Sequence, residues 1–140
     1  MTMSIITLTT DFGIDDEYVG LMKGVILSIA PTVNLVDITH HIDPQDIVQA
    51  AHIVNSSYSY FPEGTVHVVV VDPGVGGKRD IIALQVSQHV FVAPDNGVLT
   101  LLFEAESVEA LIRVENSQYF LRSTTIFRRI LTPKGTRTRT

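Results

Sequence analysis

Short runs of apolar and β-branched residues alternate along the chain with stretches of helical periodicity. The short runs predict strands over residues 4–11, 34–39, 66–71, 81–86, 90–93 and 108–114. Apolar positions at helical spacing predict a helix from residue 18 to Pro31, a second that begins at Asp43, and a short third over 98–104. This order predicts an α/β fold, a three-layer domain with a largely parallel central sheet.

Two local patterns add detail to this prediction. Residues 66–71 form the most apolar strand, and continuous apolarity is typical of a strand buried on both faces in a parallel sheet. Asp43 is suited to cap the second helix and Pro44 to be its first residue, because the first helical turn leaves its amide hydrogens unpaired. We therefore expect this helix to begin directly after a short loop that follows the second strand.

The composition narrows the class of protein. A chain of 140 residues suits one domain, and 45% hydrophobic with 18% charged residues argues against a disordered chain. No cysteine is present, which excludes disulfides, thiolate metal sites and cysteine nucleophiles. No apolar run approaches the roughly 20 residues of a membrane span, and the first residues do not resemble a signal peptide. We expect a cytoplasmic protein with no membrane partner.

Charge is distributed unevenly along the chain. Residues 1–112 hold 14 acidic and 3 basic residues, whereas residues 113–140 hold 7 basic residues and one acidic residue. The change predicts an α/β domain over 1–122 followed by an atypical basic tail over 123–140, which we expect to be disordered because its end lacks apolar periodicity. We expect no nucleic-acid partner, because the acidic domain would repel phosphates.

Three predicted strands end in residues that can carry chemistry. These ends are residues 10–13, 40–43 and 72–79, and they share one rim of the sheet if the strands are parallel. The third is glycine-rich, but a phosphate-binding Walker loop would need glycine in place of Asp72 and Ser or Thr in place of Arg79. Asp72 would also repel a phosphate, so we do not expect a nucleotide-phosphate site.

The carboxylates at these ends each allow two interpretations. Asp72 and Arg79 can form an ion pair that ties down their loop, or can together hold and polarise a small nucleophile such as water. Asp11 can cap the turn that follows it, or accept hydrogen bonds from the hydroxyl groups of a sugar. The residues alone leave both pairs of alternatives open.

Histidines and carboxylates also gather around the second strand end, where they suggest a metal site. Adjacent histidines on an extended segment point to opposite faces, however, and Asp43 and Asp46 are suited to a helix start. We therefore predict no metal site. His52 and His67 are interpreted as ordinary helix and strand residues, and His89 as a hairpin residue.

Several motifs in series give the chain a family resemblance. They are Thr-Asp-Phe-Gly at 10–13, Asp-Ile-Thr-His at 37–40, Val-Asp-Pro-Gly-Val-Gly at 71–76 and Ala-Pro-Asp-Asn-Gly at 93–97. In order and spacing over residues 4–122, the chain resembles the S-adenosyl-L-methionine (SAM) hydroxide adenosyltransferase family. That family also contains SAM-dependent halogenases.

The resemblance implies a reaction and a set of site residues. Activated water attacks ribose C5′ of SAM and releases adenosine and L-methionine, with SAM as the substrate and no cofactor. Asp72 and Arg79 match two members of the family's water-activating set of Asp, Arg and His. Asp11 matches the carboxylate that holds the ribose hydroxyls, and Gln45 lies where family members line the substrate pocket. Asp72 favours water over a halide, because a carboxylate repels an anion.

The chain also departs from the family pattern. The segment 125–131 lacks the third member of the set, a histidine, and the family's C-terminal β-barrel domain has no counterpart in the sequence. The resemblance implies a homo-oligomer, a trimer whose pocket lies between subunits. These differences predict impaired SAM hydrolysis by this chain. The alternatives are a non-catalytic SAM- or adenosine-binding domain and, less favoured by Asp72, a halogenase.

Overall fold

A mixed β-sheet forms the centre of the structure, a computed structural model that describes residues 4–72, 80–105, 108–114 and 137–138. The strands are β1 (Ile5–Thr10), β2 (Asn34–Thr39), β3 (Val66–Val70), β4 (Ile81–Val86), β5 (His89–Pro94), β6 (Val108–Val114) and β7 (Arg137–Thr138). The helices are α1 (Tyr18–Ile29), α2 (Ile47–Ser57) and α3 (Thr100–Ala105), with a 3-10 turn, η1 (Tyr58–Tyr60), after α2. None of the described helices is both long and apolar enough to cross a membrane.

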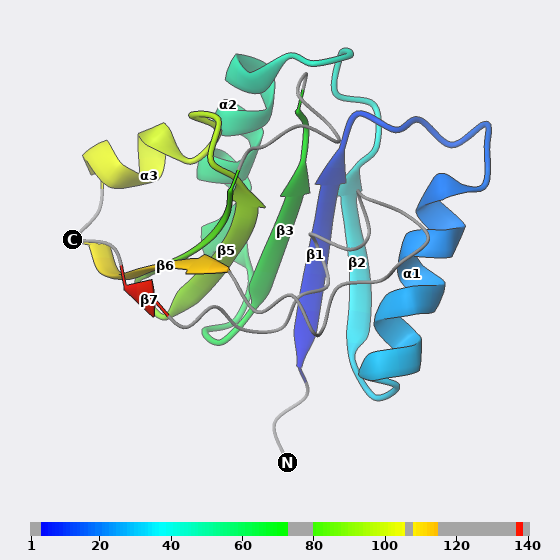
Figure 1. The fold of residues 1–140 in the computed structure, drawn as a ribbon, viewed down its shortest axis with the longest axis horizontal. Helices are drawn as coiled ribbons and strands as arrows, with labels where there is room; N and C mark the ends of the chain where they lie inside the picture. The colour runs from blue at the N-terminus through cyan, green and yellow to red at the C-terminus, as the bar shows by residue number, and fades with distance from the viewer. Residues whose placement is uncertain (1–3, 73–79, 106–107, 115–136, 139–140) are drawn as a thin grey trace.

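The strand order of the sheet is β2-β1-β3-β5-β4-β6-β7 (Figure 1). The first four strands in this order run parallel to one another, whereas β4 is antiparallel to both β5 and β6. The prediction of an α/β fold with a largely parallel sheet is confirmed. Parallel strands end at the same edge, which is the upper edge in Figure 1.

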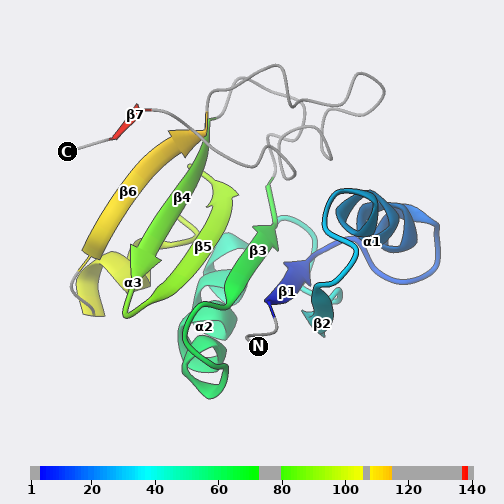
Figure 2. The same ribbon diagram turned by 90° about the horizontal axis from the view of Figure 1, so that it is seen from below.

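Helices cover both faces of the sheet, as the view in Figure 2 shows. Helix α1 packs on one face through Met22 and Ile26, which lie among buried residues of β1 and β3. Helices α2 and α3 cover the other face, where the larger core contains Phe91, Leu84 and Leu102. The predicted three layers are therefore present, with the buried strand β3 contributing to both cores.

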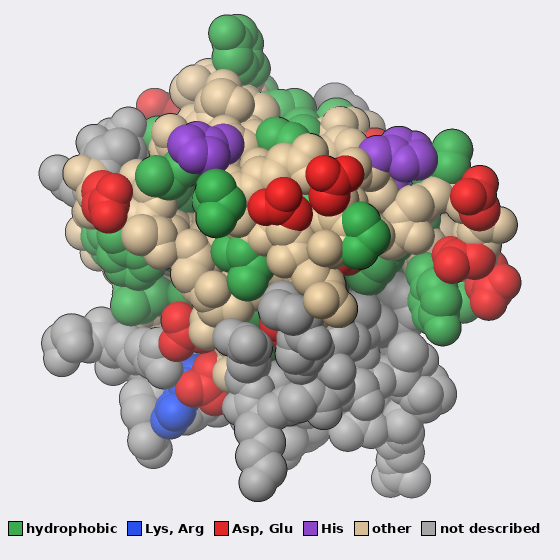
Figure 3. Space-filling view, turned by 90° about the horizontal axis from the view of Figure 1, so that it is seen from above, with side chains coloured by type: hydrophobic (Ala, Val, Ile, Leu, Met, Phe, Trp, Pro, Cys, Tyr) green, Lys and Arg blue, Asp and Glu red, His purple; other side chains and the backbone are tan. Residues whose placement is uncertain are grey.

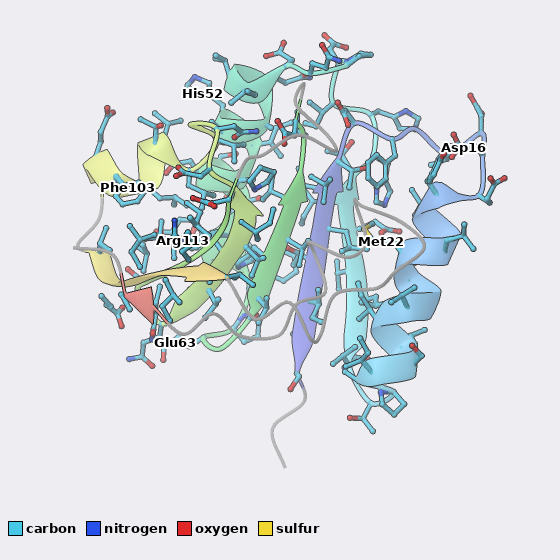
Figure 4. The ribbon with its side chains drawn as sticks, viewed as in Figure 1. Asp16, Met22, His52, Glu63, Phe103 and Arg113 are labelled. Carbon is cyan, nitrogen blue, oxygen red and sulfur yellow. The ribbon has the colours of Figure 1, made fainter. Side chains whose placement is uncertain are left out.

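Met22 is one of the two buried residues of α1, together with Ile26. Its side chain is 0% exposed and points from α1 toward the strands (Figure 4). We expect Met22→Ala to lower the free energy of unfolding by about 2–5 kcal/mol, because it leaves a cavity as well as removing apolar contacts. Urea unfolding measures this change, with the half-exposed Leu21→Ala as the control on the same helix. Equal losses in the two variants would contradict this packing.

The start of α2 differs from the prediction. The helix begins at Ile47, and Asp46 rather than Asp43 caps it by accepting a hydrogen bond from the Gln49 amide at 2.9 Å. Gln45 has a φ of 63°, which lies in the left-handed region and separates Pro44 from the helix. The expectation that Asp43 and Pro44 start the helix was wrong because both aspartates are good caps and the backbone of Gln45 decides between them.

The predicted basic tail is described only at β7. Arg137–Thr138 pairs antiparallel with β6. The remainder of 123–140 lies outside the described residues, and the tail there stays a prediction.

Candidate active site

The carboxyl ends of the parallel strands bring several polar residues to one edge of the sheet, including the predicted Asp11 and Asp72. Asp11 follows β1, Asp72 lies two residues beyond β3, and Asn96 lies two residues beyond β5. The strands β1, β3 and β5 are neighbours in the sheet, so the three side chains follow adjacent strand ends. The expectation of a shared rim is confirmed for the strand ends that carry Asp11 and Asp72, whereas Asn96 was not among the predicted residues.

Asp11 and Gln45 are joined directly. The Gln45 amide donates a hydrogen bond to Asp11 Oδ2 at 2.8 Å, although the two residues are 34 positions apart in the chain. The Asp11 side chain therefore holds the loop between β2 and α2. Among the described residues, its second oxygen, Oδ1, accepts no hydrogen bond, and this oxygen remains available for a ligand.

Two backbone hydrogen bonds hold the same loops together. The Gly13 amide donates to the His40 carbonyl at 2.7 Å, and the Ile42 amide donates to the Thr10 carbonyl at 3.3 Å. Gly13 has a φ of 72°, which glycine adopts without the strain a side chain would bring. The loops that follow β1 and β2 thus form one fixed corner of the rim.

Asp72 is buried at the end of β3, with 8% of its surface exposed. Its position fits a carboxylate that is shielded from bulk water at the rim. Arg79, its predicted partner, lies outside the described residues, so the predicted Asp72–Arg79 pair stays a prediction. The segment 125–131 also lies outside them.

Asn96 has a role that the sequence interpretation did not assign. Its Nδ2 donates to the Val71 carbonyl at 2.8 Å, directly before Asp72, and its Oδ1 accepts from the Val98 amide at 3.0 Å. Asn96 therefore fixes the backbone beside Asp72 to the turn before α3. The Pro-Asp-Asn-Gly motif was the available signal, since asparagine in such a turn bonds nearby backbone groups.

The histidines of this region are hydrogen-bonded rather than arranged around a metal. His40 is 4% exposed; its Nδ1 lies 2.8 Å from Thr10 Oγ1 and its Nε2 lies 2.8 Å from Asp37 Oδ1. Among the described residues, no three metal-ligating side chains form a cluster. His67 in β3 is likewise hydrogen-bonded to Thr7 and His89, as expected for a strand residue.

Asp37 stands between two donors. Lys23 Nζ lies 2.6 Å from its Oδ2, and His40 Nε2 approaches its Oδ1. Burial alone would raise the pKa of Asp37, but the hydrogen bonds from Lys23 and His40 outweigh that effect and hold the pKa below its ordinary value. Asp37 is therefore an anion that ties α1 to the end of β2.

The rim is acidic where the structure describes it. Figure 3 looks onto this edge and shows acidic side chains and histidines spread across it. The carboxylates that follow the four parallel strand ends include those of Asp11, Asp43, Asp46, Asp72 and Asp95. Carboxylates attract cations and accept hydrogen bonds from hydroxyl groups, so this part of the rim suits a positively charged ligand that carries hydroxyls.

The chain is similar to proteins of a known family. Residues 6–138 match the family model of the SAM hydroxide adenosyltransferase N-terminal domain, a range that passes the predicted boundary at residue 122. A protein of Methanocaldococcus jannaschii named (R)-S-adenosyl-L-methionine hydrolase is 40% identical over 122 residues, which cover 84% of this chain and 46% of that protein. A protein of an Actinoplanes species named fluorinase is 28% identical, covering 81% of this chain and 46% of its own.

A solved structure is also similar. A conserved protein from Thermotoga maritima superposes with a TM-score of 0.83 and 38% identity, covering 91% of this chain and 50% of that one. The chain thus spans about half the length of the relatives that it matches. The family match and the shared fold agree, and the chain belongs to the SAM hydroxide adenosyltransferase family, with its N-terminal domain as the matched part.

Proposed function

We propose that this chain binds S-adenosylmethionine at the acidic rim and takes part in its hydrolysis to adenosine and L-methionine. The observation that carries the proposal is the Asp11–Gln45 hydrogen bond, which fixes a carboxylate at the rim with Oδ1 facing no described partner. A carboxylate oxygen held in this way can accept hydrogen bonds from ribose hydroxyls. The relatives named as SAM hydrolases support the same substrate.

Asp72 is the proposed acceptor of the water proton. Water forms a bond from its oxygen to C5′, the C5′–S bond breaks, and its electron pair stays on sulfur to give the neutral thioether of methionine. One water proton is released through Asp72 to solvent. Sulfonium is a good leaving group, so the protein has to align the water and limit its hydration rather than supply an acid.

Arg79 is proposed as the partner of Asp72. The negative charge of the rim also favours the binding of SAM. SAM carries a positive sulfonium and a positive amino group, which the carboxylates at the strand ends attract. The reaction as written needs no cofactor.

We also propose a cytoplasmic location and a homo-oligomer, as the family resemblance implies. Leu21 and Ile29 lie on the outer surface of α1 and are 51% and 55% exposed, so they offer apolar area for contact between subunits.

The alternative is a non-catalytic SAM- or adenosine-binding domain. The Asp11 carboxylate that the Gln45 amide holds at the rim would support ligand binding in either case. A halogenase is less favoured, because the Actinoplanes fluorinase is 28% identical whereas the hydrolase is 40% identical.

Product analysis tests these functions. The purified chain is incubated with SAM, with and without chloride, and adenosine, methionine and halo-adenosine are quantified by chromatography. We expect adenosine and methionine in equal amounts, above the uncatalysed background and independent of chloride. Halo-adenosine would instead indicate a halogenase, and tight adenosine binding with no product would indicate the binding domain.

A further inference from the structure

Four side chains form a continuous hydrogen-bonded chain beneath the Asp11 corner of the rim. It runs from Lys23 Nζ to Asp37 at 2.6 Å, from Asp37 to His40 Nε2 at 2.8 Å, and from His40 Nδ1 to Thr10 Oγ1 at 2.8 Å. Thr10 is 0% exposed and directly precedes Asp11. These hydrogen-bonded side chains therefore link α1, β2 and β1 to Thr10, the residue beside the proposed ribose-binding carboxylate.

An irregularity in the sheet makes this series of hydrogen bonds possible. In the pairing of β1 with β2, Leu8 is opposite Asp37 and Thr9 is opposite Thr39, so Ile38 is an extra residue in β2. In a regular strand, Asp37 and His40 would point to opposite faces, because side chains alternate. The bulge changes that alternation and brings both side chains to the α1 side of the sheet.

Each donor in this series of hydrogen bonds has an acceptor when His40 is neutral. In the neutral tautomer that carries its hydrogen on Nε2, this N–H donates to the Asp37 carboxylate and Nδ1 accepts the Thr10 hydroxyl hydrogen. Thr10 Oγ1 in turn accepts a hydrogen bond from the Phe12 amide at 3.2 Å. Each buried polar atom of the chain then has a partner, and the direction of every hydrogen bond is fixed.

The same series of hydrogen bonds fixes the backbone on either side of Asp11. The Thr10 hydroxyl holds the Phe12 amide, the His40 carbonyl holds the Gly13 amide, and the Asp11 carboxylate holds the Gln45 amide. Asp11 thus lies between residues that His40 contacts through both its side chain and its main chain. A shift of His40 or Thr10 would move the Asp11 carboxylate and the Gln45 loop together.

We infer that His40 and Thr10 are positioning residues, which set the Asp11 carboxylate and the Gln45 loop in the geometry that binds the ribose of the ligand. Lys23 and Asp37 hold His40 in its tautomer and orientation. This inference rests on the proposed function for its ligand, but the positioning of the loops is independent of that ligand. The hydrogen bonds of His40 and Thr10 reach the residues on either side of Asp11, so in this inference both act through Asp11.

Two variants of His40 separate its two hydrogen bonds. His40→Asn keeps an acceptor near the position of Nδ1 and so preserves the contact with Thr10, whereas His40→Gln keeps only a donor toward Asp37. Thr10→Val removes the hydroxyl at nearly constant volume. The controls are His52→Gln, an exposed histidine on α2, and Thr9→Val, a buried threonine of the same strand that alternation places on the other face.

The first readout is amide hydrogen exchange of the whole chain without ligand. Exchange at Gly13 and Gln45 should rise about tenfold or more in Thr10→Val and His40→Gln, remain near the parent value in His40→Asn and the controls, and stay unchanged in the centre of β3. The second readout is the dissociation constant for adenosine, measured by calorimetry. It should rise about tenfold in the same two variants, as expected for the loss of one fixed hydrogen bond.

The two readouts separate this inference from the proposed function. Unchanged exchange at Gly13 and Gln45 would overturn the positioning role, whatever the ligand. Faster exchange with unchanged adenosine affinity would also overturn it, because the residues would then be structural only. If the parent chain fails to bind adenosine, the proposed ligand is wrong, and faster exchange in the two variants still supports the positioning of the loops.

Discussion

Replacing Asp72 with asparagine should lower kcat for adenosine formation at least about 100-fold and leave KM within a few-fold of the parent value. An amide has nearly the shape of the carboxylate but cannot accept the water proton. Asp72 is 8% exposed at the end of β3, where the proposed reaction needs a shielded base. Initial rates of adenosine release over a range of SAM concentrations measure both constants.

The matched control is Glu104→Gln, which neutralises an exposed carboxylate in α3. It should leave both constants unchanged, because it is not at the rim formed by Asp11, Asp72 and Asn96. Unfolding curves of the two variants check that each is folded. A kcat for Asp72→Asn within threefold of the parent would contradict the assignment of Asp72 as proton acceptor.

The second large effect is a loss of stability on mild acidification, due to the buried histidine pair. His67 Nδ1 contacts Thr7 Oγ1 at 2.7 Å and its Nε2 lies 3.1 Å from His89 Nδ1. Tyr58 and Phe91 pack on the two rings, and Phe61 on the His67 ring. Burial, and then the charge of His89, lower the pKa of His67 to about 4.

Burial also lowers the pKa of His89, against an opposing effect of the Glu63 charge. The unfolded chain binds protons on both histidines below about pH 6.5, whereas the folded chain leaves His67 neutral down to about pH 4. Stability is therefore full above pH 6.5 and falls as the pH drops from 6.5 toward 4. For His67 the loss by pH 5 is on the order of 2 kcal/mol.

Urea unfolding at pH 7, 6 and 5 and constant ionic strength measures this loss. His67→Gln removes the titrating group, so its free energy of unfolding should depend less on pH than that of the parent, although its stability at pH 7 is lower. His52→Gln on the exposed side of α2 should keep the parent slope. The depressed pKa of Asp37 acts at lower pH and does not contribute in this range. Equal slopes for parent and His67→Gln would refute the assignment.

The strands were predictable because their signal is local. The predicted ranges 34–39, 81–86 and 108–114 coincide with β2, β4 and β6, since β-branched runs bounded by turn residues need no tertiary information. The start of α2 was not predictable, because Asp43 and Asp46 are equally good caps and the left-handed backbone of Gln45 decides between them. That conformation depends on the hydrogen bond to Asp11, 34 residues earlier.

The site was predictable only in part, for a similar reason. Asp11 and Asp72 stand out in sequence as polar residues after apolar strands, and the parallel order of β1 and β3 brings them to one rim. The contact of His40 with Asp37 was not predictable, because regular alternation places the two on opposite faces and only the bulge at Ile38 reverses this. An extra residue in one strand leaves no local mark in the sequence.

The central claim is that the rim around Asp11 and Gln45 binds the adenosine part of the substrate. Titration of the ¹⁵N-labelled chain with adenosine, followed by amide chemical shifts, tests it most directly. We predict saturable shifts at Gly13, Gln45 and Asn96, absent in Asp11→Asn, with no shifts at Ser87 and Gln88 in the distant β4–β5 turn. Shifts confined to other surfaces, or equal shifts in Asp11→Asn, would contradict the account.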